Sequence, residues 1–236
     1  MDATIAMARR AAAEGITVIA ATPHVNSEYD PAPERIAELV DETNRALGEE
    51  DVALRVEAGA EVAITRAAEM QAQQLRRLSL GGNGWVLLES PYQHAVPFVE
   101  DAVFALQLAG SRILLAHPER APAFQRSPER LEALVERGVA CAVNATSLSG
   151  AGGSSARDLG LRLVHARLAH VICSDSHDDA RRPPALEPGI AAAELSPEET
   201  DWFTEGAPAA VLAGTDLPPR PVPLPQPPRR GLFRRR

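Results

Sequence analysis

The chain has 236 residues, of which 45% are apolar and 4% are aromatic, and its formal net charge at pH 7 is −8. This length suffices for one substantial domain, whose core we expect to consist mainly of Ala, Leu and Val. The negative charge argues against general affinity for nucleic acids over most of the surface.

Short apolar runs alternate with longer segments of helical period along the chain. The runs predict strands at residues 16–21, 53–58, 85–89, 112–116, 139–144 and 168–174. The longer segments predict helices at residues 2–14, 32–47, 64–76, 97–108, 128–137 and 156–166. Regular alternation of this kind predicts an α/β fold with a parallel sheet, open or closed into a barrel.

The composition changes near residue 217. Residues 218–228 are mostly proline, and residues 229–236 contain five arginines. Such a segment cannot build a core, so we expect a domain over residues 1–216 followed by a disordered Pro/Arg-rich tail over 217–236. The tail also suggests a weak contact with a membrane surface or an acidic partner.

The two cysteines, Cys141 and Cys173, lie within apolar runs, which predicts buried, reduced thiols. The sequence has no signal-peptide pattern and no apolar span of about 18 residues. These features together predict a soluble, cytoplasmic protein, and they leave the oligomeric state open.

Three histidines share one context, because each follows a predicted strand. They are His24, His117 and His177. Carboxylates occupy similar positions at Glu61, Glu89 and Asp175. In parallel α/β folds the reactive groups gather at the carboxyl ends of the strands, and a carboxylate buried there needs a charged partner or a metal ion.

Neutral imidazoles combined with carboxylates suit Mn²⁺, Fe or Zn²⁺. Six ligands exceed what one ion takes while keeping a position open for water. The six residues therefore predict two or three divalent ions, an arrangement used for phosphoryl transfer.

Two arginines follow these ligands closely, Arg120 after His117 and Arg182 after His177. A guanidinium group binds phosphate oxygens bidentately, so we expect both arginines to hold a phosphate. His94, in the loop after Glu89, is a further candidate for the substrate pocket.

Cysteine-based phosphatase chemistry has no support in this sequence. It requires an arginine six residues after the nucleophile, whereas Ser147 stands there after Cys141 and Asp179 after Cys173. A phosphate-binding P-loop and a G-x-S-x-G serine elbow are also absent from the sequence.

Five blocks, in order and spacing, resemble a known family: EGITVIAATPH, AGAEV, VLLES, LLAHPER and SDSHDDARRPP. The chain resembles the bacterial metal-dependent protein-tyrosine phosphatases of the PHP (polymerase and histidinol phosphatase) superfamily, which are encoded with capsule and exopolysaccharide synthesis machinery. The resemblance runs from residue 1 to about residue 217.

This resemblance implies a distorted (β/α) barrel with a trinuclear, usually manganese, centre on the C-terminal side of the strands. It implies that His24, Glu61, Glu89, His117, Asp175 and His177 are metal ligands and that Arg120 and Arg182 bind the phosphate. The implied substrate is phosphotyrosine on the tail of a tyrosine kinase of polysaccharide synthesis.

The sequence departs from the family at its beginning. Members open with a strand carrying Asp-x-His-x-His and an Asp-Gly-Pro turn, whereas this sequence begins at the helix that follows. We therefore expect the first barrel strand and its ligands to be missing from this chain, with the natural start further upstream. A catalytically defective phosphotyrosine-binding homologue and a phosphoesterase acting on a small metabolite such as histidinol phosphate remain as alternatives.

Overall fold

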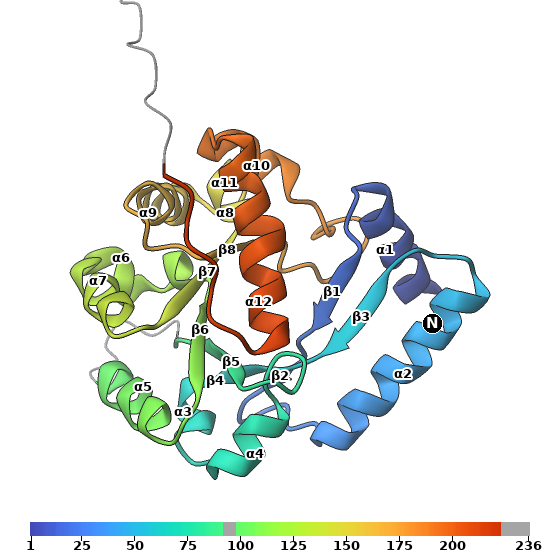
Figure 1. Cartoon of the computed structure of the whole chain (residues 1–236), viewed down its shortest axis with the longest axis horizontal. Coiled ribbons are helices and arrows are strands. Elements are labelled where there is room, and N and C mark those ends of the chain that lie inside the picture. The colour runs from blue at the N-terminus through green and yellow to red at the C-terminus, as the bar shows by residue number, and fades with distance from the viewer. Residues whose placement is uncertain (92–97, 223–236) are drawn as a thin grey trace, which may run out of the picture.

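The structure is a computed structural model that describes residues 1–91 and 98–222. All six predicted strands are present, with slightly different ends (Figure 1). They are β1 (Val18–Ala21), β3 (Arg55–Ala58), β5 (Trp85–Glu89), β6 (Arg112–Ala116), β7 (Ala140–Asn144) and β8 (Val171–Cys173). Two further strands are shorter than any sequence alternation can reveal, namely β2 (His24–Val25) and β4 (Glu61–Ala63).

The described strands form two parallel sheets, which confirms the α/β class. Strands β1 and β3 pair with each other over four residues, from Val18 opposite Arg55 to Ala21 opposite Ala58. The chain then continues from β1 into β2 and from β3 into β4, and both of these belong to the larger sheet. That sheet has the order β2-β4-β5-β6-β7-β8.

The helices follow the predicted alternation. Most of the predicted ones are present, as α1 (Asp2–Ala13), α2 (Pro33–Glu49), α5 (Val99–Leu108), α7 (Glu129–Glu136) and α9 (Ser154–His165). The structure also contains short helical segments that were not predicted: η1 (Pro118–Arg120), α6 (Pro122–Arg126), α8 (Ala145–Ser149), α10 (Glu187–Ala193), α11 (Pro197–Asp201), η2 (Trp202–Gly206) and α12 (Ala207–Ala213). Among the helices of the described ranges, none combines the length and the apolar content needed to cross a bilayer.

The prediction of a single helix over residues 64–76 is wrong. The segment forms two helices, α3 (Ile64–Ala67) and α4 (Ala72–Arg77). Gln71 between them has extended backbone angles, and its N–H donates to the side chain of Gln74 at 3.2 Å. This local cap starts a new helix, which the apolar periodicity alone cannot distinguish from a continuous one.

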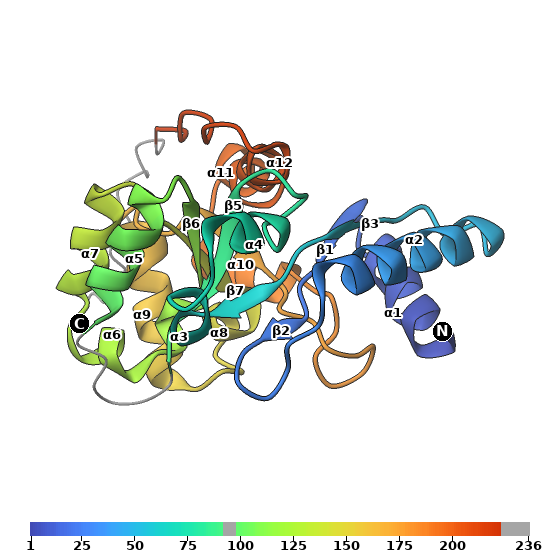
Figure 2. The ribbon, with the colours of Figure 1, turned by 90° about the horizontal axis from the view of Figure 1, so that it is seen from below.

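The larger sheet carries the main core, and helices α4, α5, α7 and α9 surround its strands (Figure 1). Side chains of the central strands are fully buried, including Val86, Leu88, Ile113 and Leu115. A second, small cluster unites α1 and α2 with the segment before β3, through Ala8, Ala11, Leu47 and Leu54. Figure 2 shows that α1, α2, β1 and β3 project together to one side of the main body.

The described part of the expected tail, residues 217–222, lies against the domain. Trp202 Nε1 donates to the carbonyl oxygen of Pro218 at 3.0 Å, and the Arg220 guanidinium lies 4.5 Å from the centre of the Phe203 ring. Arg220 also donates to the carbonyl oxygens of Val164 and Ala169. The expected boundary at residue 217 therefore falls within packed chain, and the rest of the expected tail lies outside the described residues.

Helix α10 packs closely on α8, the helix that follows strand β7. A Cβ atom added at Gly189 would lie 2.5 Å from the Cα atom and 2.6 Å from the carbonyl oxygen of Ala145. We therefore expect Gly189→Ala to lower the free energy of unfolding by about 1–3 kcal/mol, the cost of overpacking. Urea unfolding measures the change. The matched control is Gly48→Ala in α2, where an added Cβ atom meets nothing within 4 Å. Equal stability of the two variants would contradict the packing described here.

Candidate metal centre

Strand register brings four of the predicted ligands together. His24 opens β2 and pairs directly with Glu61, which opens β4. Glu89 ends β5 opposite Ala63 of β4 on one side and opposite Ala116 of β6 on the other. His117 follows Ala116 directly, so the four side chains lie along one edge of neighbouring parallel strands.

A compact cluster consists of His24, Glu61 and Glu89, whose ligand atoms all lie within 4.8 Å of one another. His24 Nδ1 is 3.9 Å from Glu61 Oε1 and 3.9 Å from Glu89 Oε2. This nitrogen is buried, and it has no hydrogen-bond partner among the described residues. One imidazole nitrogen facing two carboxylates is a donor set that suits a divalent cation such as Mn²⁺, Fe²⁺ or Zn²⁺.

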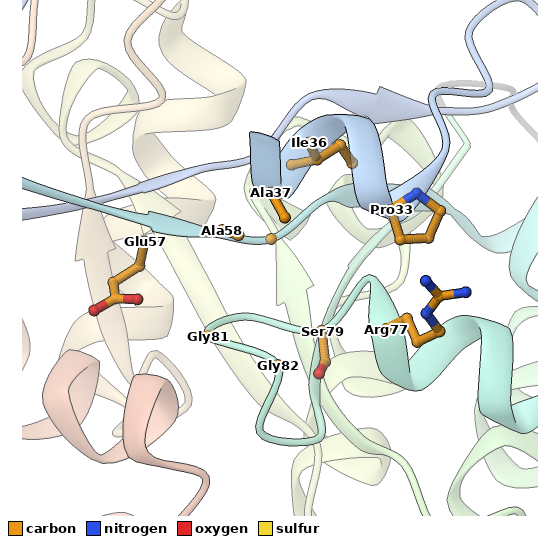
Figure 3. A pocket seen from close by; sticks show the side chains of 10 residues that line it. Pro33, Ile36, Ala37, Glu57, Ala58, Arg77, Ser79, Gly81 and Gly82 are labelled. Atoms are coloured by element: carbon orange, nitrogen blue, oxygen red, sulfur yellow. The ribbon is translucent and has the colours of Figure 1, made fainter. Parts of the chain in front are cut away.

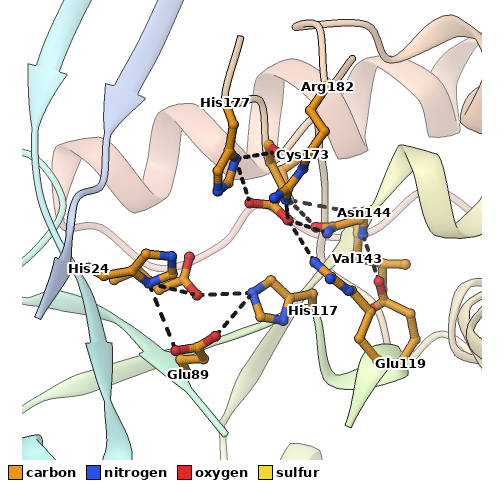
Figure 4. Close-up of polar contacts among 12 residues, drawn as sticks. His24, Glu89, His117, Glu119, Val143, Asn144, Cys173, His177 and Arg182 are labelled. Atoms are coloured by element: carbon orange, nitrogen blue, oxygen red, sulfur yellow. Dashed lines mark hydrogen bonds and ion pairs between the residues drawn. The ribbon is translucent and has the colours of Figure 1, made fainter. Parts of the chain in front are cut away.

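His117 joins this group through Glu61. His117 Nε2 lies 2.9 Å from Glu61 Oε1 and 4.0 Å from Glu89 Oε1, and the side chains of His117 and Glu61 are each 6% exposed. Figure 4 shows His117 facing Glu89 and His24 across this cluster.

Glu61, which is buried, and Glu89, which is partly buried, respond differently to their surroundings. Burial would raise the pKa of Glu61, but the hydrogen bond and positive charge of His117, together with His24, lower it overall. Burial and the negative charge of Glu61 raise the pKa of Glu89. Burial opposes the charged form of His117, yet its bond to Glu61 raises the His117 pKa. Two adjacent carboxylates thus compete for positive charge, which a bound cation would supply.

The other predicted residues form a second group around Asp175. Arg120 Nη1 and Arg182 Nη2 both donate to Asp175 Oδ2, at 3.0 and 2.5 Å. The carboxylate is 12% exposed, and the two arginine side chains are 33% and 39% exposed. Two guanidinium groups therefore converge on one oxygen at a site that solvent can reach.

His177 lies between the two groups. Its Nδ1 is 3.0 Å from the backbone oxygen of Asp175, and its ring centre is 6.3 Å from that of His24. Its side chain is 42% exposed. The six predicted ligands therefore do not share one shell. Three form the compact cluster and His117 adjoins it, whereas His177 lies beside it (Figure 4) and Asp175 is bonded to the two arginines.

Two of these residues have left-handed backbone angles, His117 with φ 31° and Asp175 with φ 49°. Such angles cost free energy for residues other than glycine, on the order of 1 kcal/mol each. His117 directly follows the last residue of β6, and Asp175 lies two residues after the end of β8. At both places the chain turns as it leaves the sheet.

The loop that carries Arg182 is closed by Asp178. Its Oδ1 accepts the backbone N–H groups of Ala180, Arg181 and Arg182, and these bonds lower the Asp178 pKa. The N–H of His177 donates to the carbonyl oxygen of Arg182 at 3.0 Å. This bond joins the two ends of the loop, so His177 and Arg182 are held close together.

Sequence reasoning missed two buried polar residues beside the site, Asn144 and Glu119. They are 1% and 0% exposed. Asn144 is the last residue of β7. It could have been found by the criterion that identified the carboxylates, which is a polar residue at the end of a strand. Glu119 lies between His117 and Arg120 and could have been suspected for that reason. His94 lies outside the described residues, and its role stays a prediction.

A separate cavity of about 240 Å³ lies between α2 and the segment around α4 (Figure 3). Its lining includes Pro33, Ile36, Arg77 and Ser79 but none of the predicted site residues. Arg77 forms an ion pair with Glu34. We therefore assign the candidate site to the cluster of titratable side chains and not to this cavity.

Comparison with known proteins gives a consistent result. Residues 1–200 match the family model described as "Capsular polysaccharide synthesis, CpsB/CapC". The tyrosine-protein phosphatase YwqE of Bacillus subtilis (strain 168) is 37% identical over 176 residues, which cover 74% of this chain and 69% of YwqE. The putative tyrosine-protein phosphatase CapC of Staphylococcus aureus is 27% identical over 184 residues, covering 78% and 72%.

A solved structure also matches. It comes from a crystallographic study of YwqE from Bacillus subtilis and CpsB from Streptococcus pneumoniae, described there as unique metal-dependent tyrosine phosphatases. The TM-score is 0.83 at 33% sequence identity, over 94% of this chain and 92% of the other. This likeness confirms the predicted fold class.

Proposed function

The chain belongs to the CpsB/CapC family of capsular polysaccharide synthesis proteins, and from this premise we propose that it is a metal-dependent phosphatase acting on phosphotyrosine in proteins. The observation that carries the proposal is the compact cluster of His24, Glu61 and Glu89 beside two converging arginines. A metal-ligand set next to a pair of arginines that can bind phosphate is a combination suited to hydrolysis of a phosphoric monoester.

The residues present fit a divalent cation, because a buried imidazole nitrogen faces two carboxylates. We propose manganese, held by His24, Glu61, Glu89 and His117 with Asp175 and His177 as further ligands. The chemistry such ions supply is a lowered pKa of a water molecule and neutralisation of charge on the phosphoryl group.

Arg120 and Arg182 are the residues that we propose to bind the phosphate and stabilise its negative charge. Both guanidinium groups now donate to Asp175 Oδ2, so they are already oriented toward one point. A phosphoryl group entering beside Asp175 would receive the same donors and gain stabilisation as its charge develops. The leaving group is a phenol with a pKa near 10, which departs more readily than an alkanol.

The likeness to proteins named tyrosine-protein phosphatases supports a protein-borne substrate over a small metabolite. His24, His177 and Arg182 are each about two fifths exposed, at 39%, 42% and 39% of the side chain. A phosphotyrosine on a flexible segment can reach such a site from solvent. We propose as substrate the tail of a bacterial tyrosine kinase of capsule or exopolysaccharide synthesis, in the cytoplasm.

Removal and restoration of metal tests the proposal. We expect EDTA-treated protein to release no phosphate from a phosphotyrosine peptide and Mn²⁺ to restore release, with much slower turnover of histidinol phosphate. Faster turnover of histidinol phosphate would favour a metabolite phosphoesterase. Peptide binding without phosphate release at any Mn²⁺ concentration would indicate a catalytically defective binding protein.

A further inference from the structure

The buried amide of Asn144 connects the two groups of the site. Its Nδ2 donates to Asp175 Oδ2 at 2.7 Å, and Asn144 is only 1% exposed. Asp175 Oδ2 thus has three donors, of which two are partly exposed arginines and the third is this amide. Asp175 Oδ1 is the oxygen left on the side of His177 Nδ1, 3.8 Å away.

The orientation of the amide is fixed from both ends. Cys173 Sγ lies 3.3 Å from Asn144 Oδ1 and can donate to it, whereas the carboxylate of Asp175 can only accept. The NH₂ group must therefore face Asp175 and the oxygen must face the thiol.

The backbone of Asn144 is held as well. Its N–H donates at 3.1 Å to Oε1 of Glu119, a side chain with no exposed area. Strand pairing places Asn144 opposite Cys173, two residues before Asp175. The amide therefore has one position and one orientation before any ligand arrives.

We propose that Asn144 is a positioning residue that fixes which oxygen of Asp175 faces the metal centre. A phosphate group would compete with Asp175 for Arg120 and Arg182, because it offers more negative charge to the same guanidinium groups. Asn144 is buried and neutral, so it keeps its bond to Oδ2 while the arginines turn to the phosphate. Oδ1 would then stay free to face a bound cation on the side of His177.

This inference rests on the proposed role of Asp175 as a metal ligand. Partners of a ligand outside the coordination sphere typically contribute about 10- to 100-fold to metal affinity. We therefore expect Asn144→Ala to weaken Mn²⁺ binding, measured by calorimetric titration of the full chain, by about 10- to 100-fold. The KM for a phosphotyrosine peptide should change little, because both arginines remain.

The matched control is Asn44→Ala. Asn44 also bridges two polar groups, the N–H and the carbonyl oxygen of Val56, but it lies between α2 and β3, away from the site. It should lower thermal stability and leave Mn²⁺ affinity unchanged. Wild-type Mn²⁺ affinity in folded Asn144→Ala would overturn the proposal.

If Asn144→Ala does not fold, Cys173→Ala decides the question, because it removes the donor that orients the amide. About threefold weaker Mn²⁺ binding supports the proposal, as expected from the loss of one weak hydrogen bond, and unchanged binding overturns it. Phosphate release by the wild type is measured in parallel. A wild type that binds Mn²⁺ but releases no phosphate would contradict the proposed function, while the titrations would still decide the role of Asn144.

Discussion

Replacing His117 with alanine is expected to reduce kcat/KM for a phosphotyrosine peptide by at least about 10³-fold, beyond the ~10- to 100-fold typical of partners outside a coordination sphere. His117 is 5% exposed and lies 2.9 Å from Glu61 Oε1. Its removal leaves the buried Glu61 and the partly buried Glu89 adjacent with less positive charge between them, which disturbs the whole ligand cluster.

The matched control for this variant is His165→Ala, at the exposed end of α9. Steady-state kinetics at saturating Mn²⁺ compares the two variants, and circular dichroism checks that both are folded. Activity of His117→Ala within tenfold of the control, a free-energy difference of about 1.4 kcal/mol, would remove His117 from the catalytic centre.

Lysine at either arginine position, Arg120→Lys or Arg182→Lys, is expected to lower kcat/KM by about 10²-fold, the scale of losing one preorganised donor to a developing charge. Lysine keeps the positive charge but cannot reproduce the planar, bidentate contact with phosphate oxygens. Both arginines contact the same Asp175 oxygen, so we expect the double variant to lose less than the product of the two single effects.

Arg181 provides the matched control for the arginine variants. It neighbours Arg182 in the same loop, but it is exposed, and only its backbone N–H bonds to Asp178. Arg181→Lys should therefore retain wild-type kinetics on the peptide. Equal losses for Arg181→Lys and Arg182→Lys would mean that general positive charge, rather than a specific phosphate contact, is responsible.

Much of the site could be predicted from the sequence because its residues lie at the carboxyl ends of strands. An apolar run followed by His or Glu is visible in one dimension, and carboxyl ends of parallel strands meet at one edge of a sheet. This rule predicts that His24, Glu61, Glu89 and His117 lie together, and in the structure each of the two imidazoles lies within 4.0 Å of both carboxylates.

The remaining features depend on contacts that sequence spacing does not encode. Strands β2 and β4 are too short for a periodic signal, and the split of the helix after residue 67 depends on one local cap. Asn144 could be located at a strand end, but its partner Asp175 belongs to a neighbouring strand and loop. The division of the six predicted ligands into two groups likewise follows from side-chain orientation rather than from order along the chain.

Anomalous diffraction from crystals grown with Mn²⁺ tests the central claim most directly, because it locates the ion without reference to activity. We predict a peak at the manganese edge between the side chains of His24, Glu61 and Glu89, with Asp175 Oδ1 turned toward the same centre. A peak elsewhere on the molecule, or no peak at this cluster when Mn²⁺ is present in excess, would contradict the assignment of these residues as a metal centre.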